Sequence, residues 1–169
     1  MSDLLHCTAV FGEGGRYRYS LSREWDLRAQ QLCWIMLNPS KASADRDDPT
    51  IRRCVGFARR WGYGGIVVVN LFAYVATYPA ELLRASDPVG PFNDDTINQA
   101  TANRRVVCAW GDAKTPLLCN RVTKVWDLLE RTFTPAFCLG TTRLGNPLHP
   151  VRLASKQKLR RFDLMRRAA

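Results

Sequence analysis

Four short, continuous runs of apolar residues constrain what this chain can fold into more than any other feature of its sequence. Each run is rich in Val, Ile, Leu, Cys and Trp and lacks the apolar–polar alternation of a strand with one face in water. Such runs are typical of strands that are covered on both faces, as in a parallel sheet. The four predicted strands are residues 32–37, 66–69, 106–110 and 136–139.

Segments with helical periodicity separate these strands. Residues 49–61 place their apolar side chains on one face at steps of three and four, with Asp48 as the predicted N-cap and Pro49 at the first helical position. Strands that alternate with helices favour a parallel sheet with helices on both faces. The other two predicted helices are residues 93–103, capped by Asn93 or Asp94, and residues 120–133.

The beginning of the chain has the pattern of a β-hairpin. Residues 7–11 and 17–25 alternate between apolar and polar, and a glycine-rich turn, 12–15, joins them. The predicted fold is therefore α/β: a three-layer α/β/α sandwich around a four-stranded parallel sheet, with an N-terminal β-hairpin. With 169 residues and no internal repeat or linker, we expect a single domain over 1–169.

The N-terminus lacks the basic start and long apolar run of a secretory signal, so we expect a cytoplasmic protein. The most apolar stretch, 66–76, is shorter than the roughly 20 residues of a membrane span, and we expect no membrane partner. The six cysteines include no Cys-x-x-Cys pair, which argues against zinc ribbons and iron–sulfur sites, and we expect no cofactor. Cys33, Cys108 and Cys138 lie in predicted strands, where a free thiol acts as a small core residue.

The chain is strongly basic. Its 25 Lys and Arg against 15 Asp and Glu give a net charge of +10, which suggests a polyanionic partner, with a solvated basic surface as the alternative. Much of the excess positive charge lies in a basic tail from about residue 152. Four arginines lie on the polar side of the predicted helix 49–61. We expect the partner to be nucleic acid, specifically DNA. The residues expected to meet its phosphates are Arg52, Arg53, Arg59, Arg60, Arg152, Lys156 and Lys158.

Polar residues follow the predicted parallel strands at their carboxyl ends, where ligands bind in such sheets. Asn38 follows the first strand, Asn70 the second, and His149 lies in the loop after the fourth. Asn38 before a proline is also a common turn residue, and His149 serves equally to brace a loop. Asn70 is harder to explain structurally, because an amide after three buried valines must find partners or cost about 1–3 kcal/mol. Two amides and a histidine suit a flat polar ligand.

An acidic run, Asp45, Asp47 and Asp48, precedes the first helix. The simplest interpretation is a solvated loop in which Asp48 caps the helix; the alternative is a metal ion held by the three carboxylates. The prediction is no metal site. A P-loop, a Gly-x-Gly-x-x-Gly fingerprint and a Ser-His-Asp order are all absent from the sequence, which disfavours nucleotide-triphosphate and dinucleotide binding.

A long set of motifs is similar to a known family. The string LNPSKASADRDDPTIRRCVGFARRWGYGG, followed in order by NLFA, DPVGPFND, AWG and GNPLHP, closely resembles the DUF1643 family of small bacterial and phage-associated proteins. The resemblance covers residues 17–162. The family name by itself implies no activity.

More remotely, the order of these motifs resembles the uracil-DNA glycosylase superfamily. In that superfamily the first strand leads into a Gly-x-Asp-Pro or Gly-x-Asn-Pro core, the next ends in an Asn that reads the base edge, a later one ends in Trp-Gly, and a His-Pro loop follows. Leu37 stands here in place of the first-motif Gly, and Val151-Arg152 in place of a Ser-Pro after His-Pro. The matching segments are LNPS at 37–40, VVVN at 67–70, WG at 110–111 and HP at 149–150.

This resemblance implies a uracil-DNA glycosylase-like fold and an enzyme that hydrolyses the N-glycosidic bond of a modified or mismatched base. Asn38 would position the attacking water, Asn70 would bond the base edge and His149 would donate to the base carbonyl as charge develops. An amide cannot accept the proton of water, so the enzyme would be slow unless Asp45, Asp47 or Asp48 supplied a carboxylate. The aromatic residues considered for stacking on a flipped-out base are Trp61, Tyr63, Phe72 and Tyr74.

Two other functions stay open at this point. One is a non-catalytic module that binds nucleic acid or a modified base with the same pocket. The other is an enzyme that acts on free nucleosides or nucleotides.

Overall fold

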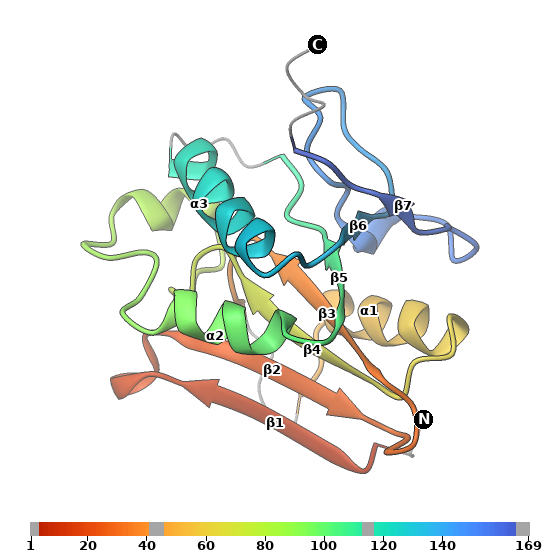
Figure 1. Cartoon of the computed structure of the whole chain (residues 1–169). Helices are drawn as coiled ribbons and strands as arrows, with labels where there is room; N and C mark the ends of the chain where they lie inside the picture. The colour runs from red at the N-terminus through yellow and green to blue at the C-terminus, as the bar shows by residue number, and fades with distance from the viewer. Residues whose placement is uncertain (1–3, 41–45, 113–116, 165–169) are drawn as a thin grey trace.

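One seven-stranded sheet organises the protein, in the order β1-β2-β4-β3-β5-β6-β7. The computed structural model describes residues 4–40, 46–112 and 117–164 (Figure 1). The strands are β1 (His6–Phe11), β2 (Arg18–Glu24), β3 (Gln31–Met36), β4 (Gly65–Asn70), β5 (Arg105–Cys108), β6 (Ala136–Cys138) and β7 (Arg160–Arg161). The helices are α1 (Pro49–Arg60), α2 (Asn93–Thr101) and α3 (Leu117–Arg131), with short 3₁₀ turns η1 (Glu13–Gly15), η2 (Pro79–Leu83) and η3 (Pro150–Arg152).

The centre of the sheet is parallel. β3 pairs in parallel with β4 on one side and with β5 on the other, and β5 pairs in parallel with β6. The carboxyl ends of all four strands therefore meet at one edge. The α/β prediction is confirmed, and each of the four buried strands lies within two residues of its predicted bounds.

The expected sheet of four strands was too small, because antiparallel strands extend it at both sides. On one side β2 pairs with β4 and β1 with β2, so the N-terminal hairpin is part of the same sheet. On the other side β7 pairs with β6. β7 lies within the segment predicted as a basic tail, and it was missed because two arginines carry no apolar pattern. Phe162, directly after it, is buried against Trp110 and Trp126.

Helices cover both faces of the sheet (Figure 1). Leu32, Trp34 and Met36 of β3 point to the face covered by α1 and pack in one core with Ile51 and Phe57. The alternate residues of β3 point to the other face, where α2 and α3 close a second core. β3 is thus buried from both sides, as its unbroken apolar sequence predicts.

The starts of α1 and α2 were predicted with different success. Asp48 caps α1 as expected, accepting a hydrogen bond from the Ile51 amide at 2.8 Å. Asn93 does not cap α2: it is fully buried, and its side-chain amide donates to the carbonyls of Asn70 and Leu71, 3.1 Å each. Because those carbonyls follow the end of β4, a tertiary contact takes the side chain that the sequence pattern assigned to a local cap.

The buried cysteines pack in the core. Cys33, Cys108 and Cys138 are buried, as predicted for their strands, and Cys54 of α1 is buried too. Burial raises the pKa of the Cys33 thiol to about 12, so that this thiol stays protonated at neutral pH. Within the described ranges, none of the helices combines the length and the apolar character that crossing a membrane requires.

Gly64 and Gly56 offer a matched test of this packing. A Cβ at Gly64 would lie 2.0 Å from the Asp26 carbonyl and 2.8 Å from the Ala29 carbonyl, both backbone atoms that cannot move independently. Gly64→Ala should therefore destabilise the protein by about 2 kcal/mol or more. Gly56→Ala, on the exposed side of α1 with open space around the new Cβ, should stabilise it by about 0.5–1 kcal/mol. Urea denaturation followed by circular dichroism measures both, and equal effects would contradict this packing.

Candidate functional site

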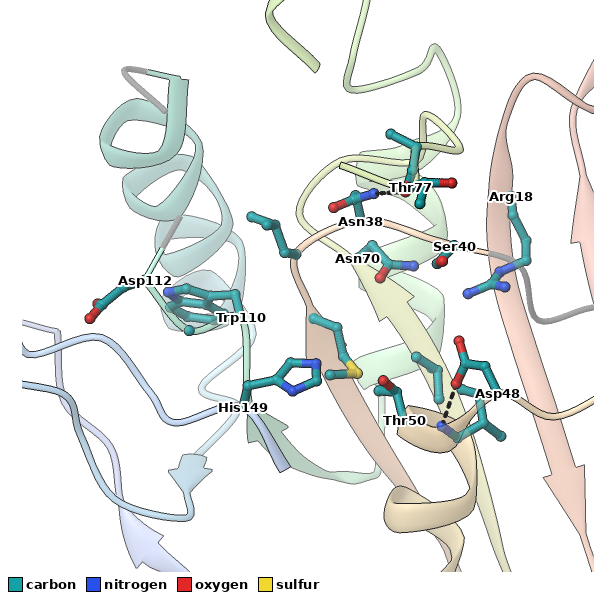
Figure 2. Close-up of a pocket in the computed structure, with 16 residues that line it drawn as sticks. Arg18, Asn38, Ser40, Asp48, Thr50, Asn70, Thr77, Trp110, Asp112 and His149 are labelled. Atoms are coloured by element: carbon teal, nitrogen blue, oxygen red, sulfur yellow. Dashed lines mark hydrogen bonds between the residues drawn. The ribbon is translucent and has the colours of Figure 1, made fainter. Parts of the chain in front are cut away.

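A cavity of about 340 Å³ opens at the carboxyl ends of β3, β4 and β5 (Figure 2). This is the edge at which open parallel sheets bind ligands, and the volume lies in the range of small-molecule pockets. The N-terminus of α1, the start of β2 and the loop before η3 complete the wall. The polar and aromatic residues lining it are Arg18, Asn38, Ser40, Asp48, Thr50, Asn70, Thr77, Trp110, Asp112 and His149.

Asn70, the last residue of β4, contributes a buried donor. Only 1% of the residue is exposed, and its side-chain nitrogen Nδ2 has no hydrogen-bond partner among the residues that the structure describes. Figure 2 shows this nitrogen directed toward the side of the cavity where Ser40 and Arg18 lie. A buried donor without an acceptor costs about 1–3 kcal/mol, and an acceptor atom on a ligand would recover part of that cost.

Asn38 is held in one orientation by the backbone. Its Nδ2 donates to the carbonyl of Pro39 at 3.0 Å and to that of Ala76 at 2.8 Å. Both donor hydrogens are thereby used, so Oδ1 is the atom of this amide available to accept a hydrogen bond from a ligand or a water.

The N-terminus of α1 brings a carboxylate to the pocket. Asp48 Oδ1 accepts from the Ile51 amide, and this bond fixes the side chain beside Thr50 (Figure 2). The preceding residue, Asp47, is anchored to the buried Arg23 of β2, whose Nη2 and Nε lie 2.8 and 2.9 Å from Asp47 Oδ1. The acidic run therefore reaches the pocket at Asp48, and Asp45 lies outside the described residues. In the described ranges, no group of three or more His, Cys, Asp or Glu side chains is arranged to hold a metal ion.

Arg18 at the start of β2 is a pocket residue that sequence reasoning missed. Val10 pairs with Ser20 but Phe11 pairs with Arg18, so Tyr19 is an extra residue in β2. This bulge puts Arg18 on the same face of the sheet as Leu21 and Arg23. Burial lowers the pKa of its guanidinium to about 10, an effect that Asp48 opposes, so Arg18 is a cation at neutral pH. A strand pattern read from the sequence does not reveal a bulge.

Trp110 and Asp112 carry the wall past the end of β5. The Trp110 ring is the aromatic surface of the pocket, and Gly111 after it adopts a positive φ of 70°. Asp112 Oδ1 accepts hydrogen bonds from Thr142 Oγ1 at 2.8 Å and Asn146 Nδ2 at 2.6 Å. These bonds hold the loop before His149 against the end of β5.

His149 lies at the rim of the pocket and points across it (Figure 2). Its Nδ1 accepts a hydrogen bond from the Val151 amide at 3.5 Å, so Nε2 is the nitrogen assigned the proton in the neutral ring. Loss of solvent around the ring lowers the pKa of His149, which the Asp48 carboxylate opposes. The side chain is therefore a neutral donor at pH 7.

Comparison with known proteins identifies a family. The model of the family described as "Protein of unknown function (DUF1643)" matches residues 18–151. The chain belongs to the DUF1643 family. No curated protein and no solved structure matches it. The match begins at Arg18 and ends two residues after His149, so that every residue described above as lining the pocket falls inside the DUF1643 domain.

None of the four aromatic residues considered for base stacking lines the cavity. Phe72 is 1% exposed in the core beneath α2 and α3. Trp61 stacks on Trp34 and Phe57 beside α1, and the Tyr63 carbonyl accepts from the Trp25 indole. Tyr74 packs edge-on against Tyr17 and does not line the cavity either. The apolar patterns around these residues are typical of buried core positions. Trp110, which does line the cavity, was predicted as the last residue of the strand 106–110 and not as a stacking residue.

The arginines of α1 have intramolecular partners. Arg53 donates to the carbonyl oxygens of Pro150 and Leu153 and to Ser155 Oγ, and Arg60 donates to the Ser155 carbonyl at 2.6 Å. Arg52 donates to the Asp47 carbonyl, and the Arg59 guanidinium lies 4.6 Å from the Trp25 ring centre. Arg53 and Arg60 thus fasten the segment after His149 to α1. The remaining predicted phosphate-binding residues, Arg152, Lys156 and Lys158, are exposed.

Replacing Arg53 should loosen this segment. Arg53→Gln removes hydrogen bonds to three acceptors in residues 150–155, and we expect amide hydrogen exchange at Leu153 and Gln157 to become roughly tenfold faster or more. Arg59→Gln, on the same helix but directed to Trp25, is the matched control and should leave those amides unchanged. Equal acceleration of exchange in both variants would mean that Arg53 does not hold residues 150–155 against α1.

The burial of His149 predicts a pH-dependent stability. Because its pKa is lowered in the folded state, the unfolded chain binds more protons as the pH falls below about 6.5, and the folded state loses stability there. The drop in melting temperature between pH 7.5 and pH 5.0 should therefore be smaller in His149→Asn than in the wild type. His6→Asn, which replaces an exposed histidine on β1, is the control and should show the wild-type drop. A wild-type drop in His149→Asn would contradict the burial of the ring.

Proposed function

We propose that this DUF1643 protein binds a nucleobase flipped out of DNA in the cavity and hydrolyses its N-glycosidic bond. The observation that carries the proposal is the convergence of Asn38, Asn70 and His149 on one cavity. Within the described residues, the buried Asn70 Nδ2 has no hydrogen-bond acceptor. A flat heterocycle with ring carbonyls supplies such acceptors, and a base in duplex DNA must leave the helix to enter a protein cavity.

We further propose that the domain is uracil-DNA glycosylase-like. Four segments support this: LNPS after β3, VVVN ending β4, WG after β5 and HP in the loop after β6. Each segment ends or follows a parallel strand, and residues from each line the same cavity. The convergence of the four segments on one cavity supports this proposal.

The leaving base would be stabilised by donors. As the glycosidic bond breaks, the sugar becomes cation-like and negative charge gathers on the base carbonyls. His149 Nε2 would donate to one carbonyl, and Asn70 Nδ2 would donate to another edge of the ring. The Trp110 ring is the surface on which the base would stack.

The attacking water would be held by Asn38 and would need a separate proton acceptor. Asn38 Oδ1 accepts a hydrogen bond from water, whose oxygen then bonds to the sugar carbon as the bond to the base breaks. An amide does not take up the proton that water releases. Asp48 is the candidate for this role, because Asp112, the other carboxylate at the cavity, is already bonded to Thr142 and Asn146. The products are the free base and an abasic sugar.

Exposed cations next to the His149 loop favour a polyanionic substrate. Arg152, Lys156 and Lys158 follow His149 in sequence and are exposed, as are Arg160 and Arg161 of β7. Because Arg53 and Arg60 are hydrogen-bonded to residues 150–155, this segment is the better candidate for phosphate contacts. Binding through these cations would weaken steeply as salt is added.

The decisive experiment uses labelled oligonucleotides that carry uracil, mismatches or hypermodified pyrimidines, followed by alkali to cut at abasic sites. We expect strand breaks with at least one substrate, and a loss of about 10²- to 10³-fold in rate in Asn38→Ala and in His149→Ala. Asn120→Ala on α3 and His6→Ala on β1 are matched controls at exposed positions away from the cavity and should keep the wild-type rate.

The other two functions would give different results. DNA binding that depends on Asn70 but yields no abasic product across the substrate panel would identify a binding module and contradict catalysis. Absence of DNA binding at low salt, with turnover of free nucleosides or nucleotides, would instead identify a small-molecule enzyme.

A further inference from the structure

We propose that Arg18 and the Asn70 side-chain amide form a subsite for an oxyanion carried by the ligand, either a carboxylate on the base or the phosphate of a nucleotide. The inference rests on the proposed function, because it assumes that the cavity holds a base. It adds the chemical class of the group that distinguishes the preferred ligand.

The first observation is that a cation is built into the cavity wall by the fold itself. Arg18 is 3% exposed, and it faces the cavity because the extra residue Tyr19 shifts the register of β2. Without this bulge, alternation along the strand would place Arg18 on the opposite face from Leu21 and Arg23. The Arg18 amide donates to the Ala73 carbonyl at 2.9 Å, which anchors the backbone at this point.

The second observation is that two donors face the same space. Figure 2 shows the Asn70 amide nitrogen and the Arg18 guanidinium directed toward each other from β4 and β2, near Ser40. Two donors do not bond one another, and Asn70 Nδ2 lacks an acceptor within the described part of the chain. A group with several acceptor oxygens between them would bond both, and a guanidinium pairs more strongly with an oxyanion than with a neutral carbonyl.

Two charged groups, Arg23 and Asp48, act electrostatically on Arg18. Arg23, the other buried arginine on this face of β2, is ion-paired with Asp47. Asp48 lies below Arg18 in Figure 2, and its Oδ1 is directed to the Ile51 amide at the helix N-terminus. Because the Asp48 carboxylate already caps α1 and interacts with Arg18, the oxyanion would be held by the donors of Arg18 and Asn70 rather than by the helix. A cavity of about 340 Å³ accommodates a ring together with such a substituent.

The test is isothermal titration calorimetry of the full chain at pH 7.5 with two pairs of probes. One pair is 5-carboxyuracil and uracil; the other is deoxyuridine 5′-monophosphate and deoxyuridine. We expect the anionic member of one pair to bind at least about tenfold more tightly than its neutral partner. The pair that shows the preference identifies whether the oxyanion belongs to the base or to the phosphate.

Three variants assign the preference to the subsite. Arg18→Gln should abolish it, and Arg18→Lys should retain part of it, because the charge remains without the planar fork. Asn70→Asp, which places a carboxylate opposite Arg18, should abolish it as well. Arg16→Gln, at an exposed position before β2, is the control and should keep it. Circular dichroism establishes that each variant is folded before titration.

The outcomes separate this inference from the proposed function. Equal binding of anionic and neutral probes by the wild type overturns the oxyanion subsite while leaving base binding intact. The oxyanion subsite is also contradicted if the preference for the anionic probe survives in Arg18→Gln or disappears in Arg16→Gln. If none of the four probes binds, both the subsite and base recognition in this cavity are contradicted.

Discussion

Parallel pairing of β3 with both β4 and β5 is the constraint on which the rest of this structure depends. Because the three strands run in the same direction, the residues that follow them emerge at one edge of the sheet. The pairing extends beyond the strands: the Leu71 amide donates to the Met36 carbonyl at 2.8 Å, and the Ala109 amide donates to the Ile35 carbonyl at 2.8 Å. The floor of the cavity is thus made of backbone that is held on both sides, which limits how far Asn38 and Asn70 can move.

α1 connects the two sides of the cavity. Its N-terminus supplies Asp48, fixed by the helix cap, and its outer face carries Arg53 and Arg60, which fasten the segment after His149. A displacement of this helix would move the carboxylate and the histidine together. The opposite face of the same helix is packed in the core with β3, so the position of both groups is set by burial of Phe57 and Ile51.

Two buried arginines form ion pairs with aspartates on opposite faces of the sheet. Arg23 pairs with Asp47, and on the other face Arg121 pairs with Asp94 at 2.6 Å. Burial pushes the pKa of Asp94 up, but Arg121 and Lys124 more than offset this and the pKa is lowered. These pairs cost desolvation energy, which favourable packing elsewhere must offset.

The sequence by itself determined the four central strands, the three helices and the Asp48 cap, because continuous apolar runs and helical spacing depend on local order along the chain. It also indicated Asn38, Asn70 and His149, since each follows a predicted parallel strand. Three features were decided only by the tertiary structure: the bulge that turns Arg18 inward, the place of Trp110 in the cavity wall, and the intramolecular hydrogen bonds of the α1 arginines. Each depends on partners from distant segments, and local periodicity carries no information about which distant segment a side chain will meet.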